Sequence, residues 1–144
     1  MVTIRVERRI KAAPEPVFSW LAEPAHLSAA PLILRARWAE DSQQPGIGAL
    51  REATAVGMWL REEITAYDPP RSYAYRIVRS IPVFDHDGGS VTLTSSVDGT
   101  LVCWTTSYTH PARSGGRVLE AVTSRVIPYN FQAILDHCAD ATES

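Results

Sequence analysis

The chain has few cysteines and no long apolar run, and each shortage argues against a class of protein. Its 144 residues include 2 cysteines, Cys103 and Cys138, which lie far apart and form no Cys-x-x-Cys pair. A disulfide scaffold and a cysteine-based metal or redox motif are therefore not expected, and both thiols are predicted to be reduced and structural. No apolar stretch approaches the roughly 20 residues that a membrane-spanning helix needs. The sequence predicts no integral membrane segment.

The chain also lacks an excess of charge of either sign. Its formal net charge is -2, which is not the basic footprint that a nucleic-acid-binding protein needs. The first nine residues carry Arg5, Glu7, Arg8 and Arg9 where a secretion signal would need an uninterrupted apolar region. We therefore expect no nucleic-acid partner, no cleaved leader and a cytoplasmic location.

Catalytic and cofactor motifs are missing as well. The sequence contains no Ser-His-Asp arrangement, phosphate-binding loop or dinucleotide fingerprint. Gly46-Ile47-Gly48 lacks the third glycine and the following helix of such a fingerprint, so it predicts only a turn. Asp85-His86-Asp87 precedes Gly88-Gly89, and three adjacent polar residues cannot easily face one ion, so a loop is predicted there. We expect neither a metal nor another cofactor.

The elements that are present begin with a strand and two short helices. A length of 144 residues suits a single domain, residues 1–144, with one core. Val2, Ile4 and Val6 alternate with polar residues, which predicts a strand that ends near Ile10. Proline near the start of a helix is well tolerated, so residues 14–23 predict a short helix that Pro24 ends. A second helical turn is predicted over residues 25–30.

The middle of the chain is typical of an antiparallel meander. A strand is predicted over residues 32–40, and the Gln43-Gln44-Pro45-Gly46 segment predicts a loop. Strand patterns then fill residues 50–109, with turns at Gly57, at Asp68-Pro69-Pro70-Arg71, at residues 85–89 and at Asp98-Gly99. Asp-Gly favours a two-residue hairpin turn, which predicts that Val97 faces Thr100.

The turn at Gly57 brings two opposite charges to the same side of the predicted sheet. A two-residue loop there places Arg51 on the same face as Leu60 and Glu62. A charge inside a sheet is costly unless it is paired, so we predict that Arg51 and Glu62 meet on the inner face. The alternative is a solvated pair near the end of a strand. Tyr75 and Ile77 are expected on this inner face too, because Arg76 alternates with them.

A long helix is predicted from the end of Ser114-Gly115-Gly116 to about Ala139. Apolar residues at helical spacing predict its inner stripe, which comprises Val118, Val122, Val126, Phe131, Ile134, Leu135 and Cys138. Pro128 lies within it and removes a backbone hydrogen bond, so the sequence predicts either a kink or a break at that point.

Four segments of the chain carry a resemblance to a known family. They are Ala13-Pro14-Glu15-Pro16-Val17-Phe18, Gly46-Ile47-Gly48, the run from Glu63 to Arg71, and Asp98-Gly99-Thr100 with Trp104. In this order and spacing the chain resembles the START-like helix-grip superfamily (SRPBCC), and most closely its polyketide cyclase/dehydrase and lipid-transport family. The resemblance implies an α+β fold with a seven-stranded curved antiparallel sheet around a long C-terminal helix, and two short helices after the first strand.

Three functions follow from this reading. The resemblance implies a carrier or sensor that binds a small hydrophobic ligand, such as a lipid or a polyketide-like molecule, between the sheet and the helix. The predicted ligand contacts are Arg51, Leu60, Glu62, Tyr75, Ile77, Leu93, Trp104, Tyr108, Val122, Val126 and Tyr129. The alternative is a polyketide cyclase or dehydratase in which Glu62 is the general base and Arg51 or Tyr75 stabilises an enolate oxygen. A protein-interaction module, with these aliphatic residues as plain core, is the third. No pattern specifies an oligomeric state.

Overall fold

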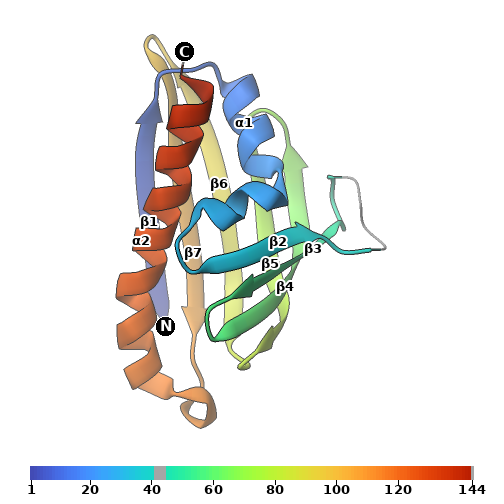
Figure 1. Ribbon diagram of the computed structural model, residues 1–144, viewed down its shortest axis with the longest axis vertical. Helices are drawn as coiled ribbons and strands as arrows, with labels where there is room; N and C mark the ends of the chain where they lie inside the picture. Colours follow the sequence, from blue (N-terminus) through green and yellow to red (C-terminus); the bar gives the residue numbers. More distant parts are fainter. Residues whose placement is uncertain (41–44, 144) are drawn as a thin grey trace.

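One curved sheet wrapped against a long helix dominates the computed structural model, which describes residues 1–40 and 45–143 (Figure 1). Gln43 and Gln44 of the predicted loop lie outside the described residues. In chain order the elements are β1 (Val2–Ile10), α1 (Pro14–Ala22), the 3-10 helix η1 (Pro24–Ala29), β2 (Ile33–Trp38), β3 (Leu50–Ala55), β4 (Met58–Asp68), β5 (Ser72–Ile81), β6 (Asp85–Ser96), β7 (Gly99–Thr109), the 3-10 helix η2 (Ala112–Ser114) and α2 (Gly116–Thr142).

The seven strands form one sheet in the order β1-β7-β6-β5-β4-β3-β2, and every neighbouring pair is antiparallel. Register shifts interrupt the pairing of β2 with β3, of β4 with β5 and of β6 with β7. Such bulges bend a strand and increase its twist, which gives the sheet its curvature. In Figure 1, α2 lies along β1 and β7, with α1 and η1 beside it. The predicted α+β helix-grip architecture is confirmed.

The core lies between the inner face of the sheet and the helices. Alternate residues of β7, including Val102 and Trp104, are buried. Their partners on the neighbouring strand β6 are Leu93 and Val91, respectively. The same period of two makes Ile4 and Val6 the inner residues of β1. Helix α1 adds Val17, Phe18 and Leu21, and α2 adds Ile134, Leu135, Cys138 and Ala139.

The last hairpin has a different register from the predicted one. Ser96 pairs with Gly99 and Ser95 with Thr100, so the turn residues are Val97 and Asp98, and Val97 does not face Thr100. Gly99 is the residue with a positive φ, and a side chain there would collide with the carbonyl oxygen of Ile10. The pairing partner of Thr100 is therefore displaced by two residues from the predicted one. Because side chains alternate with a period of two, this displacement leaves every side chain on its predicted face of the sheet.

The predicted loop over residues 85–89 is also wrong, because β6 begins at Asp85. His86 pairs with Tyr108, and Gly88 pairs with Ser107, so a bulge lies between His86 and Gly88. This extra residue turns the His86 side chain to the inner face of the sheet, where it is buried.

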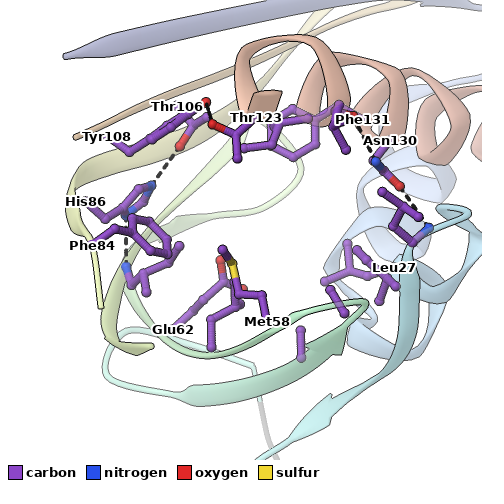
Figure 2. Close-up of a pocket in the computed structure, with 18 of the residues that line it drawn as sticks. Leu27, Met58, Glu62, Phe84, His86, Thr106, Tyr108, Thr123, Asn130 and Phe131 are labelled. Atoms are coloured by element: carbon purple, nitrogen blue, oxygen red, sulfur yellow. Dashed lines mark hydrogen bonds between the residues drawn. The ribbon is translucent and has the colours of Figure 1, made fainter. Parts of the chain in front are cut away.

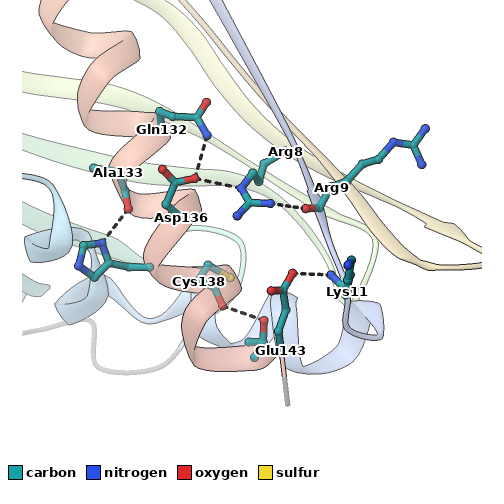
Figure 3. Close-up of polar contacts among 10 residues, drawn as sticks. Arg8, Arg9, Lys11, Gln132, Ala133, Asp136, Cys138 and Glu143 are labelled. Carbon is teal, nitrogen blue, oxygen red and sulfur yellow. Dashed lines mark hydrogen bonds and ion pairs between the residues drawn. The ribbon is translucent and has the colours of Figure 1, made fainter.

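Helix α2 runs unbroken through Pro128, so the break that was one of the two predicted outcomes does not occur. Its C-terminal half is fastened to β1, as Figure 3 shows. The Arg8 guanidinium donates to Asp136 at 2.9 Å, and the Lys11 amide donates to Glu143 at 2.9 Å. No helix among the described residues is long and apolar enough to cross a membrane.

Candidate functional site

A cavity of about 220 Å³ lies between the sheet and the middle of α2. Figure 2 shows α2 above it, Met58 and Glu62 on the floor, Phe84, His86 and Tyr108 at one end, and Leu27 at the other. The lining residues are Leu27, Leu32, Ile33, Arg51, Ala53, Ala55, Val56, Met58, Leu60, Glu62, Tyr75, Ile77, Phe84, His86, Trp104, Thr106, Tyr108, His110, Thr123, Val126, Ile127, Asn130, Phe131 and Ile134.

Most of the residues predicted to contact a ligand come together around this cavity. Those that line it are Arg51, Leu60, Glu62, Tyr75, Ile77, Trp104, Tyr108 and Val126. Leu93 is buried in the core but is not among the lining residues. The predicted inward placement of Val118, Val122 and Tyr129 is wrong, because all three side chains are exposed. The helix turns the opposite face, with Thr123, Ile127 and Phe131, toward the cavity.

Arg51 and Glu62 form a buried ion pair in the wall of the cavity. They lie opposite each other on β3 and β4, and the Arg51 Nε donates to Glu62 Oε1 at 2.7 Å. Their residues are 2% and 6% exposed, so the predicted inner-face pair is present and the solvated alternative is not. The guanidinium also lies 5.0 Å from the ring centroid of Tyr75 and 5.4 Å from that of Tyr73. Burial by itself lowers the pKa of Arg51, but Glu62 and these tyrosines outweigh it and raise the pKa, so Arg51 stays charged.

Tyr75 connects this pair to an aromatic wall. Its hydroxyl accepts a hydrogen bond from Trp104 Nε1 at 2.9 Å, and the Trp104 ring stacks on Phe131 of α2 with 3.9 Å between centroids. Burial, and then the nearby Glu62 carboxylate, raises the pKa of Tyr75, so the phenol keeps its proton. Gly89 leaves space for this ring, because a Cβ there would collide with the Tyr75 Cζ.

His86 bridges three strands at the polar end of the cavity. Its Nδ1 accepts from the backbone amide of Ile77 at 2.9 Å, which leaves the proton of the neutral ring on Nε2. Nε2 then donates to the Thr106 hydroxyl, at 2.7 Å. Burial lowers the pKa of His86 to about 4, so the imidazole is neutral near pH 7. The fixed tautomer leaves both ring nitrogens occupied.

A second polar group joins β7 to α2 at the same end. The hydroxyl groups of Tyr108 and Thr123 are 2.7 Å apart, and His110 Nε2 lies 3.2 Å from the same Thr123 oxygen. Burial lowers the pKa of His110 and raises that of Tyr108, so both are neutral near pH 7. The His110 Nδ1 is buried and has no hydrogen-bond partner. These contacts hold α2 against the end of β7 beside the cavity.

Asn130 closes the opposite side, between α2 and the start of β2. Its Oδ1 accepts from the Leu32 amide at 3.1 Å, and its Nδ2 donates to the Val126 carbonyl at 2.8 Å (Figure 2). Both halves of this buried amide are therefore satisfied, which is what its burial requires. Asn130 thus has a structural role at the cavity wall.

The lining residues give the cavity a hydrophobic character. Its surface is mainly aliphatic and aromatic, with a few fixed polar groups. The Glu62 carboxylate is already held by the Arg51 guanidinium at 2.7 Å, so it is part of the cavity wall. Among the described residues there is no group of three or more His, Cys, Asp or Glu side chains that could hold a metal ion.

Several lining residues were not among the predicted contacts, and some had a readable signal. Thr106 lies between Trp104 and Tyr108 at a spacing of two, so strand alternation alone would have placed it on the inner face. His86 had no such signal, because its orientation depends on the bulge. Leu27 and Asn130 approach the cavity through the packing of η1, β2 and α2, which no local period specifies.

A curved antiparallel sheet closed by a long C-terminal helix over an apolar cavity defines a START-like helix-grip protein. The family model described as polyketide cyclase/dehydrase and lipid transport matches residues 1–143. The chain belongs to this family. The comparison with curated proteins found no match.

Solved structures with low sequence identity have the same fold. A protein from Thermus thermophilus is 19% identical, with a TM-score of 0.79 over 99% of this chain and 100% of that chain. Ginseng major latex-like protein 151 from Panax ginseng is 15% identical, with a TM-score of 0.73 over 99% of this chain and 98% of that chain. A Mesorhizobium loti protein is 25% identical, with a TM-score of 0.68 over 99% of this chain and 100% of that chain.

Proposed function

We propose that this protein is a carrier or sensor that binds a small hydrophobic ligand in the cavity between the sheet and α2. The observation that carries the proposal is an apolar cavity of about 220 Å³ with a few oriented polar groups in its wall. Family membership supports the same class of ligand. A cytoplasmic location remains our expectation from the sequence.

The cavity volume limits the size of the ligand. Apolar cavities of about 150 Å³ accept benzene, whereas sites for drug-sized molecules occupy about 300–1,000 Å³. A value of about 220 Å³ therefore fits a compact molecule, such as one with two fused rings. The neutral hydroxyl groups of Tyr75, Thr106 and Tyr108 favour a ligand with one or two oxygen atoms.

Binding without catalysis ranks above the cyclase or dehydratase alternative. Glu62 would be the base of that reaction, and its carboxylate is already engaged by Arg51 at 2.7 Å. His86 is held as an acceptor and a donor by Ile77 and Thr106, so neither nitrogen is free for acid–base work. An interaction module without a ligand would be expected to fill this space with side chains.

The proposal is tested with protein purified from its own host. Native mass spectrometry should detect a co-purified apolar compound, and solvent extraction should identify it. In parallel, 2-naphthol should bind the ligand-free protein with one site per chain, measured by its fluorescence. Absence of both the compound and the 2-naphthol site would overturn the proposal.

A cavity-filling variant shows whether the probe binds in this cavity. Ala53 is buried in the cavity wall on β3, so Ala53→Leu should weaken 2-naphthol binding at least tenfold. Thr94→Leu adds an apolar side chain to the exposed face of β6 and should leave binding unchanged. Equal affinity in wild type and Ala53→Leu would place the probe elsewhere and contradict the assignment of the cavity.

A further inference from the structure

The N-terminal half of α2 has an exposed face that combines apolar and basic side chains. Val118, Val122, Arg125 and Tyr129 follow one another at spacings of four, three and four, which puts them on one side of the helix. Val118 is 78% exposed, Val122 is 52% exposed and Tyr129 is 65% exposed. A surface helix normally turns such residues toward the core, so this face lacks the partner that its composition fits.

Basic side chains surround these apolar ones. Arg113 of η2 and Arg117 in the first turn of α2 are exposed and precede this row in the chain, and Arg125 lies within it. In the described part of the chain, none of the three forms an ion pair. Glu120 is the one acidic residue between residues 112 and 130, and its carboxylate accepts from the His110 amide. The surface is therefore positive although the net charge of the chain is -2.

We infer that the outer face of α2, formed by Val118, Val122, Arg125 and Tyr129, docks on the surface of a bilayer that contains anionic lipids, together with the exposed Arg117 in the first turn of α2 and Arg113 of the preceding η2. Exposed apolar side chains interleaved with arginines fit the boundary between acyl chains and headgroups, where the apolar groups insert and the cations meet phosphate. Tyrosine is enriched at this interface because its ring is apolar and its hydroxyl is polar.

The position of this face connects it to the cavity. Thr123, Val126 and Ile127 of the same helical segment line the cavity on the opposite side of α2. Figure 1 shows this end of the helix projecting toward the η2 end of the molecule, away from the half that Figure 3 shows fastened to β1. In a docked protein, the segment of α2 that covers the cavity would therefore lie against the bilayer surface. The inference concerns the outer face alone and holds whether or not the cavity contains a ligand.

The test is sedimentation of the full chain with vesicles of phosphatidylcholine, with and without 30% phosphatidylserine. We expect binding to the anionic vesicles only, with affinity falling as salt increases. Each basic residue at an anionic surface contributes about a factor of five, so Arg113→Gln, Arg117→Gln and Arg125→Gln together should weaken binding about 100-fold. Val118→Ser with Val122→Ser should weaken it about tenfold or more, without a change in charge.

A matched variant separates this surface from total charge. Arg35→Gln, Arg76→Gln and Arg79→Gln remove three exposed arginines from β2 and β5, and should change vesicle binding only slightly. Equal losses in the two triple variants would contradict the inference, as would equal binding to both kinds of vesicle. Analytical ultracentrifugation without vesicles tests the other occupant of the face. A dimer that dissociates when Val118→Ser and Val122→Ser are introduced would assign the face to a second copy of the chain and overturn the inference.

Discussion

At the scale of single residues, the cavity wall depends on polar groups that are buried and individually satisfied. Arg51 needs Glu62, His86 needs Ile77 and Thr106, and Trp104 needs the Tyr75 hydroxyl. Removing one partner leaves the other buried without its hydrogen bond, which costs more than the bond contributes. These positions should therefore be more sensitive to substitution than the aliphatic residues around them.

Replacement of Glu62 by Gln should destabilise the protein by about 3–5 kcal/mol, because it leaves the Arg51 charge buried without a counter-ion. Replacement of both partners, Arg51→Met with Glu62→Met, should cost far less, because no charge remains in the cavity wall. Urea denaturation measures both free energies of unfolding. If the single variant is as stable as the double variant, the unpaired Arg51 charge does not destabilise the protein and the prediction is wrong.

His86 should make the stability of the protein depend on pH. Burial lowers the pKa of His86 to about 4 in the folded state, from 6.5, its ordinary value. The unfolded chain therefore binds a proton first as the pH falls, so stability should decrease from about pH 6.5 to about pH 4 and rise in the reverse direction.

The variant His86→Gln separates this contribution from that of other groups. It should be less stable at pH 7, since the contacts with Ile77 and Thr106 change, and should lose less stability than wild type between pH 7 and pH 4.5. Urea denaturation at the two pH values gives the comparison. Parallel losses in both proteins would show that His86 does not titrate as described.

At the scale of elements, α2 has two halves with different surroundings. The C-terminal half contributes Ile134, Leu135, Cys138 and Ala139 to the core. The N-terminal half covers the cavity and leaves Val118 exposed. Pro128 lies between them and cannot donate a hydrogen bond to the preceding turn. The helix nevertheless continues, because packing on both sides of Pro128 holds it in place.

Pro128→Ala should therefore stabilise the protein, by about 1–3 kcal/mol, because alanine restores the missing donor and has the higher helix propensity. Thermal and urea denaturation measure the change, and hydrogen exchange should slow in residues 124–128. Pro14→Ala is the matched control, because proline at the start of α1 costs little, and no comparable gain is expected. An equal gain at both sites would refute the explanation.

At the scale of the whole molecule, the fold leaves a space that the proposed ligand would occupy. The curved sheet and α2 enclose about 220 Å³ that side chains do not fill, so the native state forgoes packing contacts that a solid core would have. The proposed ligand would restore such contacts and would bind the folded state alone. Stability should then depend on ligand concentration.

Saturation with 2-naphthol should raise the melting temperature of the ligand-free protein. At a free concentration 100 times Kd, linkage predicts about 2.7 kcal/mol of stabilisation, which for a chain of this length corresponds to about 8 °C. Differential scanning calorimetry across a concentration series tests this. Ala53→Leu should show a smaller shift, and an unchanged melting temperature for wild type would contradict a cavity that binds this probe.

Local patterns predicted the order of the elements and much of the cavity wall, and the family resemblance implied how the elements assemble. Strand alternation and the short turn at Gly57 predicted that Arg51 and Glu62 face each other, because side chains of paired strands alternate strictly. The predicted register of the hairpin at Asp98 was wrong by two residues. The predicted faces of its strands were nevertheless correct, because a shift of two residues does not exchange the faces. The apolar stripe on α2 was harder, since Val118 and Val122 are apolar residues on an exposed face.

The sequence by itself determined the order of strands and helices, the inner faces of most strands and the buried ion pair, since these depend on periods of two and on turn length. Only the tertiary structure decided that a bulge turns His86 inward, that α2 continues through Pro128, and that Asn130 reaches Leu32. Each of these depends on contacts between residues far apart in the chain. Packing between distant elements, rather than local pattern, set the shape of the cavity and left one face of α2 uncovered.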